Sequence, residues 1–144
     1  MAEWYCGSVQ YTAVTQWAAL TAYSVGDIRR QLAAPAVGSE RCFRCTTAGV
    51  SGAAEPSWTL TEGATTNDGT AVWTEVTGIS TYAWAAPSAR LLLLYNTWSA
   101  AGDTIYVAQN HAETRSTSMT LTATGTTGAP VYVYCVNASG SVPP

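Results

Sequence analysis

The chain of 144 residues contains no lysine, one phenylalanine and one histidine, and only 10% of its residues are charged. The six arginines are scattered apart from Arg29-Arg30, and the formal net charge is -3. Phosphate binding needs clustered lysine and arginine, so this composition argues against nucleic acid as a partner. No apolar run approaches the length of a membrane span, since the longest aliphatic run covers only residues 91–94.

Residues 1–4 lack a basic region followed by an apolar run, so no secretory leader is expected. We therefore expect synthesis in a cytoplasm, where cysteines are reduced by default. The four cysteines are Cys6, Cys42, Cys45 and Cys135.

Hydrophobic residues make up 47% of the chain, which is enough for a folded core in one domain or two very small ones. The aromatic residues comprise six tryptophans and eight tyrosines. Both types carry a polar tip and favour half-exposed sites, interfaces and sugar contacts, although any single one more often packs at the edge of a core.

Short β-prone runs separated by turn residues predict a mainly β protein. The expected strands cover residues 4–6, 28–32, 41–47, 71–76, 104–108, 119–123 and 130–136. Asn67-Asp68-Gly69-Thr70 predicts a tight turn before the strand at 71–76. In that strand the side chain of Trp73 faces opposite to Val72 and Thr74.

One helix is expected within residues 87–98, where Leu91, Leu94, Tyr95 and Trp98 follow the spacing of one helical face. The alternative is a buried strand over residues 91–95.

Six motifs occur in order over residues 17–78, and together they resemble the small chitin- and cellulose-binding-like modules that recur in phage tail proteins. They are Trp17, Tyr23-Ser24-Val25-Gly26-Asp27, Cys42-Phe43-Arg44-Cys45, Thr47-Ala48-Gly49-Val50-Ser51-Gly52, Glu55-Pro56-Ser57-Trp58 and Asp68-Gly69-Thr70-Ala71-Val72-Trp73. The resemblance implies a three-stranded antiparallel sheet with exposed aromatics that stack on sugar rings. The implied ligand-binding residues are Trp17, Tyr23, Trp58 and Trp73.

A second resemblance covers residues 87–136. The leucine-rich helix, Ala101-Gly102-Asp103-Thr104-Ile105-Tyr106-Val107, Asn110-His111-Ala112-Glu113-Thr114 and the strands around Leu121 and Val133 are similar to the cap and first rungs of a tailspike-like parallel β-helix. An amphipathic helix would cover the apolar end of the first rung. Residues 1–16 would add a strand and linker that pack on the helix-capped segment, 79–144. Two rungs fall short of a stable solenoid, so a longer chain or neighbouring chains would supply the missing burial.

Cys42 and Cys45 form a C-x-x-C motif, for which Cys6, Cys135 and His111 are the further candidate zinc ligands. There is no second C-x-x-C, and strand positions i and i+3 point to opposite faces, so no metal site is predicted. Buried free thiols are favoured, with disulfides, including a Cys6–Cys135 bridge, as the alternative.

His111 and Glu113 lie two residues apart, which is compatible with acid–base chemistry. No nucleophile motif accompanies them, so a loop histidine that caps a turn is the favoured interpretation. The nine acidic residues suggest no catalytic carboxylate pair. We therefore predict no catalytic residue and no cofactor.

The two resemblances imply a non-enzymatic structural protein of a phage virion, peripheral on the particle. It would decorate the capsid or form a head fibre, or anchor a tail fibre or spike. Its partners would be other virion chains, as a homotrimer by analogy, and it would act by protein–protein packing and surface adhesion. The alternatives are a carbohydrate-binding module for host surface polysaccharide and the non-catalytic head of a polysaccharide depolymerase.

Overall fold

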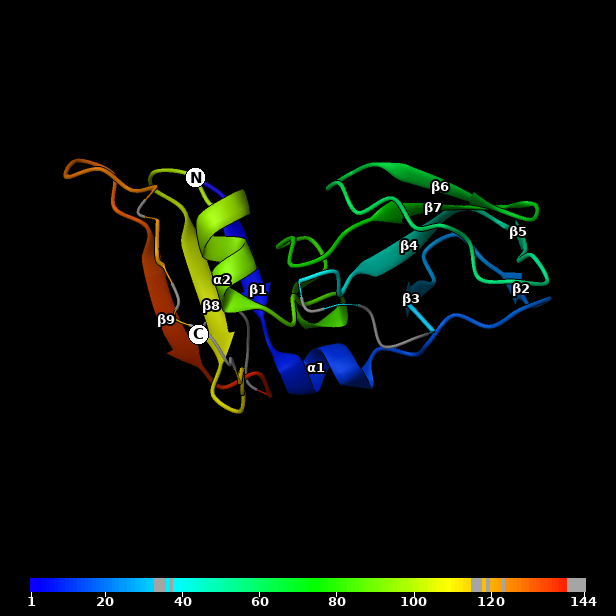
Figure 1. Cartoon of the computed structure of the whole chain (residues 1–144), viewed down its shortest axis with the longest axis horizontal. Helices are drawn as coiled ribbons and strands as arrows, with labels where there is room; N and C mark the ends of the chain where they lie inside the picture. Colours follow the sequence, from blue (N-terminus) through cyan, green and yellow to red (C-terminus); the bar gives the residue numbers. More distant parts are fainter. Residues whose placement is uncertain (33–35, 37, 115–117, 119, 123, 140–144) are drawn as a thin grey trace. The chain divides into compact units, whose positions relative to one another are not determined.

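The computed structural model describes residues 1–32, 36, 38–114, 118, 120–122 and 124–139. The chain is mainly β, as expected, and divides into two compact units (Figure 1). Unit 1 comprises residues 1–12 and 78–144, and unit 2 comprises residues 13–77.

Unit 2 contains an antiparallel sheet in the order β3-β4-β7-β6 and a two-stranded sheet of β2 and β5. The strands are β2 (Ala22–Tyr23), β3 (Ile28–Arg30), β4 (Cys42–Thr47), β5 (Gly49–Val50), β6 (Thr65–Asp68) and β7 (Ala71–Glu75). The strands expected at residues 28–32 and 41–47 form and pair with each other as β3 and β4. The expected three strands are one too few, because the polar run Thr-Thr-Asn-Asp of β6 has the composition of a loop and is a strand only through its pairing with β7.

The tight turn between β6 and β7 requires glycine. Gly69 has a φ of 61°, and a Cβ atom there would collide with the backbone carbonyl of Val50. The turn is held in place because Thr70 N donates to Val50 O at 2.9 Å. The hairpin therefore lies directly against β5.

The core of unit 2 is aromatic. Trp17, Tyr23, Phe43, Cys45 and Trp73 form one buried cluster. The predicted alternation in β7 is confirmed, because Trp73 is buried while Val72 and Thr74 are only half-buried on the opposite face.

Unit 1 is built on a parallel sheet in the order β1-β8-β9. Its elements are β1 (Glu3–Cys6), α1 (Ser8–Ala13), the 3-10 turn η1 (Ala83–Ala85), α2 (Leu91–Leu93), the π-helical turn η2 (Leu94–Trp98), β8 (Thr104–Ala108) and β9 (Tyr132–Val136). Strands from both halves of the chain thus form one sheet, since β8 pairs with β1 on one side and with β9 on the other.

The leucine-rich stretch is helical, so the alternative of a strand over residues 91–95 is wrong. Leu94 is buried with Trp4 and Ile105, and Leu91, Tyr95 and Trp98 pack against the same cluster. The helix ends in a π turn in which Ser99 N donates to Leu94 O at 2.8 Å.

The strand predicted at residues 119–123 does not form where the structure describes it. Met119 and Ala123 lie outside the described residues, and Thr120, Leu121 and Thr122 belong to no strand. The side chain of Asn96 instead binds Thr120 O and Thr122 N, at 2.8 and 3.0 Å, and so satisfies backbone groups that a strand would pair. The described part of the chain shows one parallel sheet here and no β-helix. Among the described residues no helix is long and apolar enough to cross a membrane.

Asp103 is the polar anchor of unit 1. Its Oδ1 accepts a hydrogen bond from Ala2 N at 2.5 Å, and its Oδ2 accepts from Trp4 Nε1 at 3.1 Å and from Ala100 N at 3.0 Å. Burial raises the pKa of this carboxyl, but the hydrogen bonds from Ala2, Ala100 and Trp4 outweigh it and lower the pKa below its ordinary value.

Asp103→Asn should therefore destabilise unit 1 by about 2 kcal/mol at pH 7, because hydrogen bonds to a charged acceptor are lost. Because the pKa of Asp103 is lower in the folded than in the unfolded state, its ionised carboxylate stabilises the fold at pH values above the ordinary pKa. This stabilisation is lost as the pH falls through the pKa of the folded state. The free energies of unfolding of variant and wild type, measured in urea, should differ less at pH 3 than at pH 7. The surface change Glu62→Gln is the control. An equal difference at both pH values would contradict the assignment.

Candidate functional site

The four aromatic residues predicted to bind sugar meet in space, but three of them are buried inside the protein. Trp17, Tyr23 and Trp73 are only 2%, 4% and 0% exposed. Trp58 is half-buried and stacks on Phe43 with 4.0 Å between ring centroids. Stacking on a sugar needs an open ring face, and Trp17, Tyr23 and Trp73 lack the exposure expected of them, whereas Trp58 keeps part of its surface exposed.

These tryptophans are buried because a carboxylate, that of Asp68, binds their indole N–H groups inside the core. Asp68 Oδ2 accepts hydrogen bonds from Trp17 Nε1 at 2.7 Å and from Trp73 Nε1 at 3.0 Å, and Oδ1 accepts from Gly52 N at 2.8 Å. The polar tips of two indoles are therefore satisfied without water, which allows both rings to lie in the core. The pattern Asn-Asp-Gly-Thr indicates only a turn residue at this position.

A second polar cluster in unit 1 joins Cys6, His111 and Glu113. Cys6 Sγ lies 3.8 Å from His111 Nε2, which in turn lies 3.5 Å from Glu113 Oε2. His111 Nδ1 accepts a hydrogen bond from Ser8 N at 3.1 Å, so the loop histidine binds the first residue of α1.

This cluster resembles a nucleophile, base and acid in order, but its thiol is unsuited to attack. Cys6 is completely buried, and burial together with the charge of Glu113 raises the pKa of its thiol far above the ordinary value. Glu113 Oε2 also accepts from Leu91 N at 3.1 Å, at the start of the helix. As placed, these residues link α1, the helix and the 111–113 loop.

The cysteines form no bridge in this structure. All four are free, with Cys6, Cys42 and Cys45 buried and Cys135 exposed. Cys6 and Cys135 both align with Val107, on opposite sides of β8. Two strand spacings separate them by roughly 9.5 Å, beyond the roughly 7 Å that a disulfide can span, so the Cys6–Cys135 pairing is wrong. Among the described residues, no group of three histidine, cysteine, aspartate or glutamate side chains is placed so that it could hold a metal ion.

The most open part of the described sheet is the strand β9, whose only paired neighbour there is β8. Its residues Tyr132, Val133 and Tyr134 are 47%, 45% and 49% exposed, and Cys135 is also exposed. We call the side of β9 that faces away from β8 the β9 edge. Sequence alternation predicts a strand here but does not distinguish an edge from the middle of a sheet.

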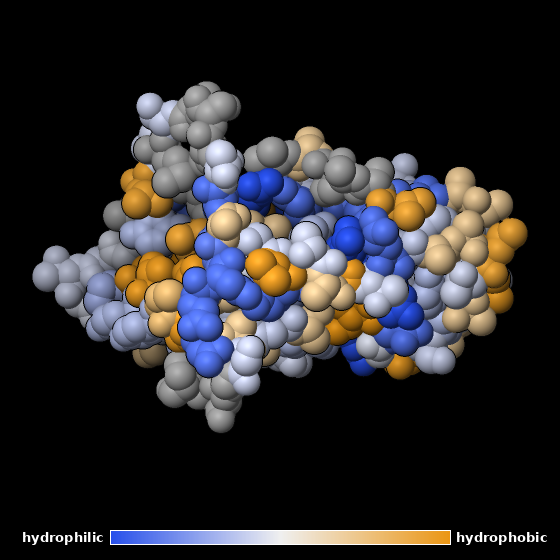
Figure 2. All heavy atoms as spheres, turned by 90° about the horizontal axis from the view of Figure 1, so that it is seen from below, coloured by the Kyte–Doolittle hydropathy of each residue, from blue (hydrophilic) through white to orange (hydrophobic). Residues whose placement is uncertain are grey.

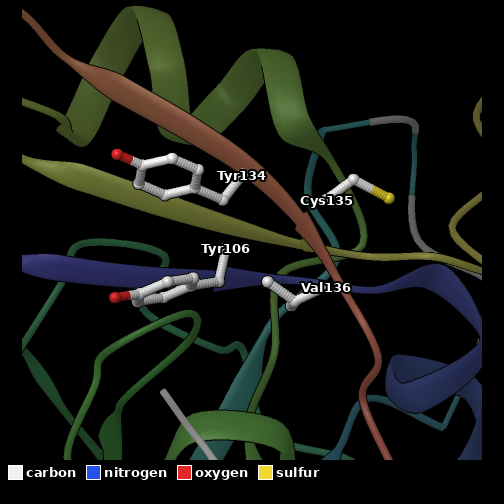
Figure 3. Close-up of a pocket in the computed structure, with 4 residues that line it drawn as sticks. All are labelled: Tyr106, Tyr134, Cys135 and Val136. Atoms are coloured by element: carbon white, nitrogen blue, oxygen red, sulfur yellow. The ribbon is translucent and has the colours of Figure 1, made fainter. Parts of the chain in front are cut away.

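Tyrosine rings line one face of the sheet up to this edge. Tyr5 lies 5.3 Å from Tyr106, Tyr106 lies 6.2 Å from Tyr134, and Tyr134 stacks parallel to Tyr132 at 6.1 Å, each measured between ring centroids. Figure 3 shows the hydroxyls of Tyr106 and Tyr134 pointing the same way, with Cys135 turned away from them. A hollow of about 260 Å³ opens between Tyr106, Tyr134, Cys135 and Val136.

Within the described strand, the β9 edge carries neither a charge nor a proline that would oppose pairing. Residues 116–144 contain no charged side chain, and β9 contains no proline. Natural sheets protect exposed edges with charges, prolines or bulges, because free backbone groups bind other strands. An exposed, neutral, aromatic edge is therefore a candidate binding surface.

Another apolar surface lies in unit 2 at the end that carries β2 and β5. Leu20 is 71% exposed and has a φ of 51°, which is unusual for a side chain of this type. Figure 2 shows apolar atoms gathered at the right-hand side of the view, where Figure 1 places β2 and β5. These strands have two residues each, and β5 is bound by the turn at Thr70, so β9 is the longer exposed strand.

No family model matches the chain, and neither the curated proteins nor the solved structures contain a significant match. The β9 edge and the tyrosine rings beside it are consequently the features from which a function can be inferred.

Proposed function

We propose that this protein acts stoichiometrically, as an assembly protein whose β9 edge accepts a strand from another protein chain. The observation that supports this most strongly is an exposed edge strand without a single charge or proline beside two stacked, exposed tyrosines. No chemical step is involved, and the free energy comes from backbone pairing and apolar burial.

Backbone pairing supplies affinity in strand addition, and side chains supply selectivity. Tyrosines are common at the centres of interfaces because a large apolar ring carries a hydroxyl that can bind at the rim. Tyr132 and Tyr134 offer this combination on the face that also contains the hollow.

We further propose the setting that the sequence resemblances imply, a peripheral structural protein of a phage virion bound to other virion chains. The lysine-free surface, rich in threonine, serine and glycine, is compatible with packing between chains. Capsid decoration, a head fibre and the anchoring of a tail fibre or spike all use such contacts. Sugar binding is not favoured, since three of the four residues predicted for it form the core of unit 2 and Trp58 packs against that core.

The variant Val133→Lys tests the proposal, because a charge on the β9 edge opposes strand addition. In particles produced with this variant as the sole copy, the amount of the protein per particle should fall at least tenfold, as measured by quantitative mass spectrometry. The matched control is Val25→Lys, which changes a valine of similar exposure in unit 2. Equal incorporation of both variants would contradict the proposal.

A further inference from the structure

We infer that the strand bound by the β9 edge belongs to a second copy of this chain, paired antiparallel about a two-fold axis at Tyr134. This inference rests on the proposed function and specifies its partner. Four observations support it: the direction of the backbone groups of β9, the covered edge of β1, the absence of charge, and the position of the hollow.

The backbone groups of β9 alternate between β8 and the open side. Tyr132 N donates to Asp103 O at 2.9 Å, and Gln109 N donates to Val136 O at 2.8 Å, so residues 132 and 136 direct their backbone groups toward β8. Alternation along a strand then directs the N–H and C=O groups of Val133 and Cys135 outward. Two residues with outward groups, placed symmetrically about Tyr134, form a self-complementary edge.

Antiparallel pairing of β9 with its own copy uses these groups fully. Val133 of each chain lies opposite Cys135 of the other, and each such pair exchanges two hydrogen bonds. Tyr134 then lies opposite its own counterpart in a pair without mutual hydrogen bonds, with Cα atoms about 4.5 Å apart. The same patch is used on both copies, as a closed two-fold interface requires.

The opposite edge of the sheet cannot receive a strand in the same way. Tyr5 N donates to Gly78 O, Ser88 N donates to Tyr5 O, and Gly7 N donates to Ser88 O, each at 2.8 Å. Head-to-tail stacking of β9 on the β1 of a neighbour would have to break these bonds. The homotrimer expected by analogy would need such a head-to-tail contact if it used this edge, so the geometry favours a two-fold pair.

Charge and shape also fit a second copy. Like charges facing each other across paired strands are destabilising, but residues 116–144 carry none, so identical strands meet without repulsion. In the two-fold register, Tyr132 of the second copy lies opposite Val136, at the mouth of the hollow bounded by Tyr106 and Tyr134. An uncharged edge offers nothing that a charged partner would complement.

A disulfide trap tests the register. In the variant Tyr134→Cys with Cys135→Ser, the two introduced thiols would lie within the Cα separation that a disulfide requires. Mild oxidation should convert most of the chain to a covalent dimer on a non-reducing gel. The wild type should crosslink at least tenfold less, because Cys135 lies opposite Val133 of the second copy and the remaining cysteines are buried.

Random collision is measured with Leu20→Cys in the same Cys135→Ser background, which places an exposed thiol in unit 2. Tyr134→Cys crosslinking no faster than Leu20→Cys would overturn the inference. Sedimentation equilibrium provides a second measurement: the wild type should approach twice 15.1 kDa at high concentration, and Val133→Lys should remain at 15.1 kDa. A wild-type mass that stays at one chain or reaches three chains would also overturn it.

The proposed function and this inference can fail separately. A monomeric wild type with no trapped dimer, together with poor incorporation of Val133→Lys into particles, would overturn the second copy as partner and leave the strand-accepting function standing. If the wild type is monomeric and Val133→Lys is also incorporated normally, both the strand-accepting function and the second copy as partner would be overturned.

Discussion

Asp68→Ala should unfold unit 2 at 25 °C. The carboxylate accepts from two buried indoles and one backbone amide, at 2.7 to 3.0 Å. Alanine removes all three hydrogen bonds and leaves the two buried indole donors without partners in the core. The free energy of unfolding should fall by about 4 kcal/mol, because hydrogen bonds to a charged group are lost and buried donors are left without acceptors.

Asp68→Asn separates hydrogen bonding from packing, because it keeps the size of the side chain and one acceptor oxygen. Asp68→Asn should lower the free energy of unfolding by about half as much as Asp68→Ala. The measurement is hydrogen exchange followed by mass spectrometry, in which peptides from β6 and β7 should lose protection while β1 and β8 of unit 1 keep theirs. Glu62→Ala, an exposed acidic residue of unit 2, is the control. Retained protection in β7 of Asp68→Ala would contradict the role of this carboxylate.

The second large effect is a decrease in the stability of unit 2 as the pH rises. Glu75 is fully buried, and its Oε2 has no hydrogen-bond partner among the described residues. Burial raises its pKa from 4.5 to about 7, and the hydrogen bonds from Thr77 and the charge of Arg41, whose Nε lies 3.8 Å away, only partly oppose this.

A folded pKa above the unfolded value means that the protonated acid favours the fold. The stabilisation is therefore complete below about pH 4.5, declines from there, and is lost above about pH 7. The difference between these pKa values corresponds to about 3 kcal/mol. Urea unfolding of unit 2 between pH 5 and pH 8 should show most of this decrease.

Glu75→Gln should flatten that pH profile and stabilise unit 2 at pH 8, because the amide cannot ionise. Glu62→Gln removes only the charge that contributes least to the raised pKa of Glu75, so it should retain most of the wild-type slope. A Glu75→Gln variant whose stability still falls between pH 5 and pH 8 would show that another group is responsible.

Local sequence patterns predicted much of the secondary structure. The strand at 104–108 coincides with β8, and the turn at Asp68-Gly69 joins β6 to β7. The amphipathic stretch from Leu91 to Trp98 is helical, with its predicted face on the core. These features depend on side-chain alternation, helical spacing and glycine conformation, all of which act between near neighbours in the chain.

Features that depend on distant residues were not predicted. β6 has a loop-like sequence and is a strand only because β7 pairs with it. Residues 120–122 alternate as a strand would, but the side chain of Asn96 binds their backbone instead. The polar helix α1 also went unrecognised, and its first residue is bound by His111, 103 positions away.

The sequence by itself determined a mainly β chain with few charges, its principal strands and turns, its one amphipathic helix and a set of amphipathic aromatics. Only the tertiary structure decided which aromatics are buried and which are exposed. Trp17 lies in the core because folding brings Asp68 to it from 51 positions away, whereas Tyr134 is exposed on a strand that, among the described residues, has a neighbour on one side only. The local sequence does not distinguish Trp17 from Tyr134, because both are aromatic residues with a polar tip. Burial depends instead on which distant groups satisfy the hydrogen bonds and cover the ring.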